Sequence, residues 1–137
     1  MHSLEDGPDR FEDLKITGVD KERTYNPDPS KLLYHVYLQL SDSAPSEWSR
    51  LFDEARSFPR HSLWRRAWCE GDHIVIHCPV DEVEMHHLAD LKQDVVSANE
   101  QYREASRKYA QLRQRESAAS AKERGRVDDT LDRLKFN

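Results

Sequence analysis

The sequence predicts an α+β protein, with a small antiparallel sheet in the element order β-β-α-β-β-α and a long projecting C-terminal coiled-coil helix. Alternating apolar residues mark the strands, a helical stripe of apolar residues follows Pro45, and neither proline nor glycine interrupts residues 80–124. Alternation at every second residue is typical of strands, whereas long stretches free of helix breakers favour helix. Strands grouped with helices in this order predict a layered α+β plan.

These elements divide the chain into four parts. We expect a disordered tail over residues 1–10, an α+β domain over 11–80 and a coiled-coil helix over 81–118. Residues 119–137 follow as a frayed linker and a short amphipathic C-terminal segment. The tail lacks an apolar run and the linker is low in complexity, and neither composition favours a packed core.

Composition narrows the class of protein. Only 36% of the 137 residues are hydrophobic and 34% are charged, which is typical of a chain with a long exposed helix or disordered ends. Residues 1–30 hold eight acids and four bases, whereas residues 80–137 hold twelve acids and eleven bases. The formal net charge of −5 and this mixed surface argue against broad nucleic-acid binding, which favours a basic face.

The chain has the features of a cytoplasmic protein. Its first ten residues lack the apolar run of a signal peptide. No stretch approaches the roughly 18 apolar residues of a membrane span. Cys69 and Cys78 fall at different heights of a predicted hairpin, so we expect free thiols, which suit a reducing compartment.

Two segments near the N-terminus predict strands. The clearest is 31–41, where one face of the strand carries Leu32, Tyr34, Val36, Leu38 and Leu40. Its other face carries Leu33, His35, Tyr37 and Gln39. This period of two indicates a strand buried on at least one side. Residues 13–19 predict a weaker strand, and the two prolines of 24–30 indicate a loop between them.

A helix and a β-hairpin are predicted next. Pro45 suits the first turn of a helix, because its missing N–H would be unpaired there. The helical stripe consists of Trp48, Leu51, Phe52, Ala55 and Phe58. Residues 63–78 then predict a hairpin that turns at 70–72. Its core face should carry Ile74, Ile76 and Cys78.

The long helix is expected to begin near Asp81. Asp81 and Glu84 have the spacing of a capping box, in which each side chain bonds a backbone N–H of the first turn. Val80 and Met85 have the spacing of a hydrophobic staple. Together these signals predict a helix that starts at 81.

This helix carries a coiled-coil seam, which is the predicted partner-binding site. Apolar or aromatic residues recur at spacings of three and four without a break: Leu88, Leu91, Val95, Ala98, Tyr102, Ala105, Tyr109 and Leu112. Such a repeat keeps one narrow face toward a partner helix. Beyond it, Glu116 and Glu123 occupy the seam positions, so the repeat stops.

The composition of the seam indicates the kind of partner. Alternating Tyr and Ala differs from the Ile/Leu core of a parallel zipper, and favours an antiparallel homodimer or a different protein helix. A parallel homodimer would also place Lys108, Arg113 and Arg115 beside their own copies. For the stripe that resumes at Val127, Leu131 and Leu134, two alternatives remain: a short helix folded back, or a docking peptide for a partner groove.

A second candidate interface is the sheet face opposite the core. Its candidate residues are Tyr37, Trp64, Arg65, Arg66, Trp68, His73 and His77. Aromatic and arginine side chains on an open sheet stack bases in RNA-binding domains, so a nucleic-acid-binding adaptor is the alternative function. The competing interpretation is that residues 11–19 or a second copy of the chain cover this face. Its Trp, Tyr and Arg would equally suit a protein interface.

No catalytic, metal or cofactor motif emerges. His73 and His77 are four residues apart on a strand, about 13 Å, so one ion cannot bind both. His86 and His87 point about 100° apart on a helix. No glycine-rich phosphate loop or paired acids stand out among the residues. The sequence therefore predicts a non-catalytic protein-protein interaction or assembly module without a cofactor.

Overall fold

The structure is a computed structural model that describes residues 11–136 of the chain. The elements, in chain order, are β1 (Ile16–Val19), β2 (Tyr34–Leu40), α1 (Ser46–Arg56), β3 (Ala67–Glu70), β4 (His73–Cys78), η3 (Val83–His87) and α2 (Leu88–Asp132). The predicted α+β class and the order β-β-α-β-β-α are confirmed. The expected disordered tail, residues 1–10, lies outside the described residues.

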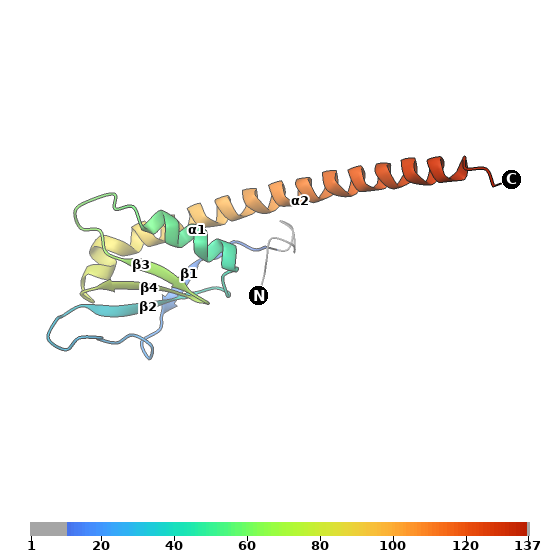
Figure 1. Cartoon of the computed structure of the whole chain (residues 1–137). Coiled ribbons are helices and arrows are strands. Elements are labelled where there is room, and N and C mark those ends of the chain that lie inside the picture. The colour runs from blue at the N-terminus through green and yellow to red at the C-terminus, as the bar shows by residue number, and fades with distance from the viewer. Residues whose placement is uncertain (1–10, 137) are drawn as a thin grey trace.

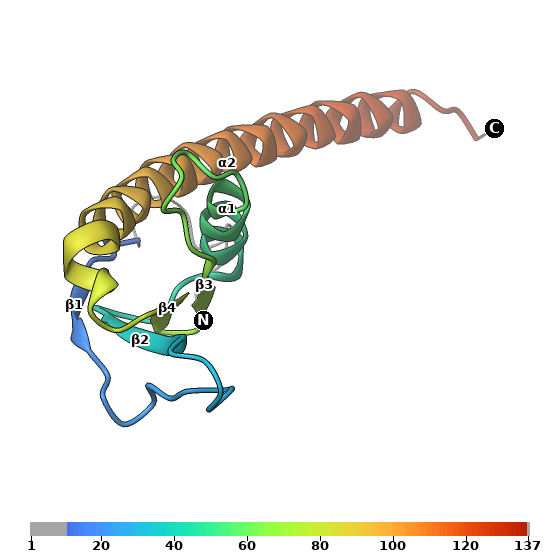
Figure 2. The ribbon, with the colours of Figure 1, turned by 90° about the vertical axis from the view of Figure 1, so that its left-hand side faces the viewer.

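The four strands form one antiparallel sheet in the order β1-β2-β4-β3. The central pair is in continuous register, with Val36 opposite Ile76 and Leu38 opposite Ile74. Both helices lie on the same face of the sheet, and α2 continues far beyond it (Figures 1 and 2). One sheet face is therefore packed against helices, as in other layered α+β folds.

The β3–β4 hairpin turns through Gly71 and Asp72, since Glu70 pairs with His73. Gly71 has φ 59, and no other described residue has a positive φ. A positive φ at the first central position alone is the geometry of a type II′ turn, which twists in the same sense as the strands. The predicted hairpin and its turn are confirmed.

Helix α1 begins directly after Pro45 and ends at Arg56. Trp48 and Phe52 are fully buried, as the predicted stripe requires. Phe58 was expected on that stripe but is 69% exposed. It lies past the end of the helix, so helical spacing no longer determines where its side chain points.

The start of the long helix differs from the prediction. The first turns form a five-residue π-helix, η3, and no side chain caps it. The expected staple is absent, because Val80 is 53% and Met85 77% exposed. The backbone N–H groups of Glu82 and Val83 instead bond the carbonyls of Pro79 and Val80. A tight turn from Pro79 thus replaces the capping box.

The end of the helix also differs. Helix α2 runs unbroken to Asp132, through the segment predicted to fray and through residues 127–132, for which a short helix folded back and a docking peptide were the alternatives. Residues 117–121 are rich in alanine, the strongest helix former, and one glycine costs only about 1 kcal/mol. Ion pairs one turn apart, Arg126–Glu123 and Arg124–Asp128, add support. Local propensity therefore outweighs the single break signal at Gly125.

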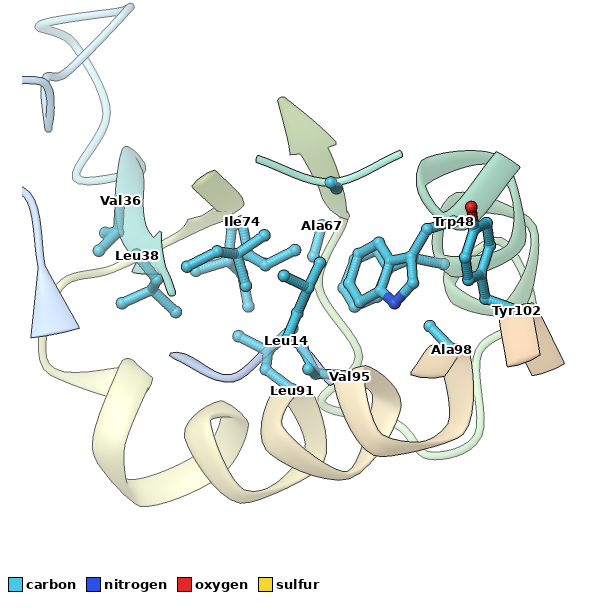
Figure 3. Close-up of a cluster of buried hydrophobic side chains, with 14 of the residues drawn as sticks. Leu14, Val36, Leu38, Trp48, Ala67, Ile74, Leu91, Val95, Ala98 and Tyr102 are labelled. Carbon is cyan, nitrogen blue, oxygen red and sulfur yellow. The ribbon is translucent and has the colours of Figure 1, made fainter. Parts of the chain in front are cut away.

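The hydrophobic core fills the space between the sheet and the two helices (Figure 3). Ile74, Ile76 and Cys78 of β4 are fully buried in it, as predicted. Leu14, from the extended segment before β1, is inserted between the sheet and α2 (Figure 3). The N-terminal segment is thus an integral part of the core, and it leads into β1 at the sheet edge.

Candidate interaction surfaces

The first half of the predicted seam is buried inside the chain's own core. Leu91, Val95, Ala98 and Tyr102 are each at most 2% exposed, and Leu88 packs at the edge of the same cluster. Figure 3 shows the side chains of Leu91, Val95, Ala98 and Tyr102 directed toward Leu14 and Trp48. The side chains of these seam positions stabilise the domain, and their surface is already occupied within the molecule.

A buried asparagine connects three elements at this interface. The Oδ1 atom of Asn99 on α2 accepts hydrogen bonds from the Leu14 N–H at 3.0 Å and from Trp48 Nε1 at 2.9 Å. Its Nδ2 donates to the Leu14 carbonyl at 2.9 Å. Each buried polar group of this cluster therefore has a partner, which burial requires. Asn99 fixes the N-terminal segment and α1 against α2.

A cluster of ion pairs links α2 to α1 and to the loop that follows α1. Asp94 of α2 accepts hydrogen bonds from the guanidinium of Arg56 at 3.0 Å and from that of Arg60 at 2.6 Å. Arg56 is buried and lies 3.6 Å from the centre of the Trp64 ring. Burial lowers the pKa of Arg56, and the hydrogen bond to Asp94 opposes that shift. Two of its charged groups are desolvated, so the cluster specifies how α1 and α2 pack.

The remaining seam positions lie where α2 leaves the domain. Ala105 and Tyr109 are half-buried and Leu112 is 52% exposed. From residue 111 to residue 136, every residue is exposed except half-buried Val127. We call residues 107–132 the distal segment of α2. Its larger apolar side chains are Tyr109, Leu112, Val127 and Leu131, each of them exposed or half-buried.

The sheet face opposite the helices carries a group of contacting rings. The His35 ring lies 4.9 to 5.3 Å from the rings of Tyr25, Trp68 and His77, each edge-on. Arg66 lies over the Trp68 ring at 5.3 Å. Burial and nearby positive charge lower the pKa of His77, which favours its neutral form. We call these five residues the aromatic–histidine face.

The centre of that sheet face is covered by the chain itself. Val75 is fully buried, and Tyr37 and His73 are at most 8% exposed. Arg23, from the β1–β2 loop, lies 5.1 Å from the centre of the Tyr37 ring. We expected residues 11–19 or a second copy as the cover, but residues 11–19 lead into the edge of the sheet. The loop after β1 covers this area instead.

Two predicted members of the second interface lie elsewhere. Trp64 packs between Arg56 and Arg60, and its Nε1 donates to the Arg56 carbonyl at 3.0 Å. Arg65 binds Glu82 through two hydrogen bonds of 2.9 and 3.0 Å. Both residues precede β3, which begins at Ala67. Strand alternation therefore does not apply to them, whereas Trp68 pairs with β4 and the Arg66 carbonyl accepts a hydrogen bond from the His77 N–H.

His73 is held by carboxylates at the turn end of the sheet. Its Nε2 lies 2.8 Å from Asp20 Oδ2, and its Nδ1 lies 2.8 Å from Asp72 Oδ1. The hydrogen bond to His73 lowers the pKa of Asp20. This contact attaches the β1–β2 loop to the hairpin.

Glu82 connects η3 to the loop before β3. Besides Arg65, it contacts Nε2 of buried His87 at 3.0 Å. The hydrogen bonds from Arg65 and then His87 lower the pKa of Glu82 to about 2. The carboxylate is thus ionised at all physiological pH values and anchors the start of the long helix.

The cysteines have the environment of structural residues. Cys69 and Cys78 are both free, and burial raises the pKa of each thiol to about 11. A thiol needs its ionised form to act as a nucleophile or metal ligand, and that form is scarce at neutral pH here. Within residues 11–136, no three His, Cys, Asp or Glu side chains are placed to hold a metal ion together.

An apolar groove of about 500 Å³ lies between β1 and the start of α2. Ile16 and Val19 form one wall, and Val83 and Leu88 form part of the other. Its lining carries charges of both signs, with Asp81 and Glu84 as well as Lys92. The charges at the groove therefore favour neither an anionic nor a cationic ligand.

Comparison with protein-family models, with curated proteins and with solved structures gives no match for this chain. Among the described residues, none of the helices combines the length and apolar character that crossing a membrane requires. The fold and the surfaces above therefore define the protein as an α+β domain with a projecting helix.

Proposed function

We propose that this protein is a non-catalytic assembly module that associates through the distal segment of α2. The observation that carries the proposal is the projection of this segment from the domain (Figure 1), with larger apolar side chains that are exposed or half-buried. It spans 26 residues, about 39 Å of helix at 1.5 Å per residue. This segment is helical although none of its side chains fills the core. An exposed helix of this kind suits a surface that binds another helix.

The four larger apolar residues share one side of the distal segment. At 100° per residue, Tyr109 and Val127 point in the same direction, and Leu112 and Leu131 lie within about 60° of it. Single exposed apolar residues are normal on proteins, but a row along one helix face is typical of an interface. The buried thiols described above support a non-catalytic role.

The test compares two double variants of the full chain. Leu112→Asp with Leu131→Asp places charge on the apolar side, and the matched control, Gln111→Asp with Gln114→Asp, places it on the opposite side. We expect the first variant to lose association, with itself or with partners captured from the native cell, and the control to retain it. Light scattering and affinity capture measure this, with circular dichroism to check the fold. Equal association by both variants would contradict the proposal.

A second candidate is the nucleic-acid-binding adaptor, favoured by the exposed guanidinium of Arg66 over the Trp68 ring. Such a pair on a sheet face suits a stacked base and its phosphate. Salt-dependent retention on single-stranded RNA that Arg66→Ala weakens would support this function. Absence of retention at low salt would eliminate it.

A further inference from the structure

Charge is distributed unevenly along the exposed part of α2. Residues 107–115 contain four bases, Arg107, Lys108, Arg113 and Arg115, and no acid. Residues 127–132 contain three acids, Asp128, Asp129 and Asp132, and no base. The two blocks are carried by one continuous helix, so their separation along its axis is fixed.

Between the charge blocks the helix is narrow. Residues 117–121 are Ser117, Ala118, Ala119, Ser120 and Ala121. Small side chains allow two helix backbones to approach closely, whereas the larger Tyr109, Leu112, Val127 and Leu131 lie on both sides of this stretch. The distal segment is therefore large at both ends and small in the middle.

We propose that the partner of the distal segment is a second copy of this chain, arranged antiparallel and crossing near Ser120. This inference rests on the proposed function and names its partner. Reversing the helix about residue 120 sets Tyr109 level with Leu131 of the other copy, and the small central residues against each other. It also sets the basic block of each copy level with the acidic block of the other, with Arg113 within about 40° of the shared face.

The crossing also accounts for the acid that interrupts the seam. Glu116 lies level with Arg124 of the other copy, and both point within about 60° of the shared face. By symmetry this pair of opposite charges forms twice. A parallel pair would instead place Arg113 and Arg124, which lie near the shared face, beside their own copies, which costs energy. Charge thus selects the antiparallel arrangement.

The first test measures distances between spin labels in the full chain, with Cys69→Ser and Cys78→Ala as background and circular dichroism as a fold check. A label at Gln101→Cys should lie about 57 Å from its copy, since 38 residues of helix rise separate the two sites. A label at Ser120→Cys should lie about 10 Å from its copy, the usual helix separation. A parallel pair would give less than about 25 Å at both sites, and would overturn the proposal.

The second test exchanges charges. Glu116→Arg alone should weaken self-association roughly tenfold, because two attractions become two repulsions. Adding Arg124→Glu should restore it, since the pair reforms with reversed sign. Failure of the double variant to recover would overturn the predicted crossing point.

The two proposals fail differently. A molar mass of 16.1 kDa at every concentration overturns the second copy as partner. If another protein is then captured, and Leu112→Asp with Leu131→Asp abolishes that capture, the proposed function stands with a heteromeric partner. If neither association occurs, both proposals are wrong.

Discussion

At the scale of single residues, the polar groups within the helix layer determine how the domain is assembled. Asn99 illustrates this, because its amide bonds two backbone groups of Leu14 and the ring nitrogen of Trp48. Sequence periodicity missed Asn99 and Asp94, since only apolar positions were counted. Their burial could have been predicted, because Asn99 and Asp94 are next to Ala98 and Val95 on the buried face of α2.

Replacing Asn99 should therefore destabilise the whole domain. Asn99→Leu keeps the volume but leaves three buried groups without hydrogen bonds, each worth about 1 kcal/mol or more. We expect a loss of about 3 kcal/mol in the free energy of unfolding, measured with urea. Gln93→Leu, at an exposed position of the same helix, is the matched control and should change stability by less than about 0.5 kcal/mol. Equal effects would contradict the role of Asn99.

Glu82 gives the domain a specific acid sensitivity. Its pKa falls from 4.5 to about 2 in the folded state, so the folded protein holds the ionised form more tightly than the unfolded chain does. This stabilisation is complete above about pH 4.5 and is lost as the pH falls toward 2. Glu82→Gln should lower stability at pH 7 and reduce the loss between pH 5 and pH 3. The exposed neighbour variant Glu84→Gln should retain the acid dependence of the native chain in urea titrations.

At the scale of elements, strand alternation and the long uninterrupted segment predicted the sheet, the hairpin and the existence of α2. The use of the seam could not be predicted, because a helix packed on its own sheet and a helix packed on a partner have similar apolar spacing. The chain uses the first half of the seam internally, from Leu88 to Tyr102. The predicted end of α2 at residue 118 is wrong, because the low-complexity segment that follows is rich in alanine, which favours helix.

Gly125 offers a direct test of the unbroken helix. Apart from its chain neighbours and the adjacent backbone of the helix itself, no atom lies within 4 Å of a methyl group added there, so Gly125→Ala should stabilise the local helix by about 1 kcal/mol. Hydrogen exchange of amides in residues 118–132 should slow several-fold. Gly71→Ala is the contrasting variant, and we expect it to destabilise the hairpin because φ there is 59. Faster exchange in Gly125→Ala would indicate that α2 is broken at this position.

At the scale of the whole molecule, one helix serves two environments. Val95 lies where α2 fills the core, and Leu112 lies where α2 is exposed. Val95→Asp should unfold the domain, with a loss of more than about 3 kcal/mol, because it buries an unpaired charge. Leu112→Asp should leave the circular dichroism spectrum and urea midpoint nearly unchanged. If the Val95→Asp variant stays folded but does not associate, the first half of the seam binds a partner and does not stabilise the core.

The continuity of α2 has a mechanical consequence. Because the same helix is anchored in the core at Tyr102 and remains unbroken to Asp132, the domain cannot swivel freely around its exposed end. In a crossed pair, 18 residues on each side separate the last core positions from the crossing point, so the two domains would be held about 54 Å apart. The paired helices would then fix the distance between the two domains. Any ligand bound by one domain would be held at a set distance from a ligand bound by the other.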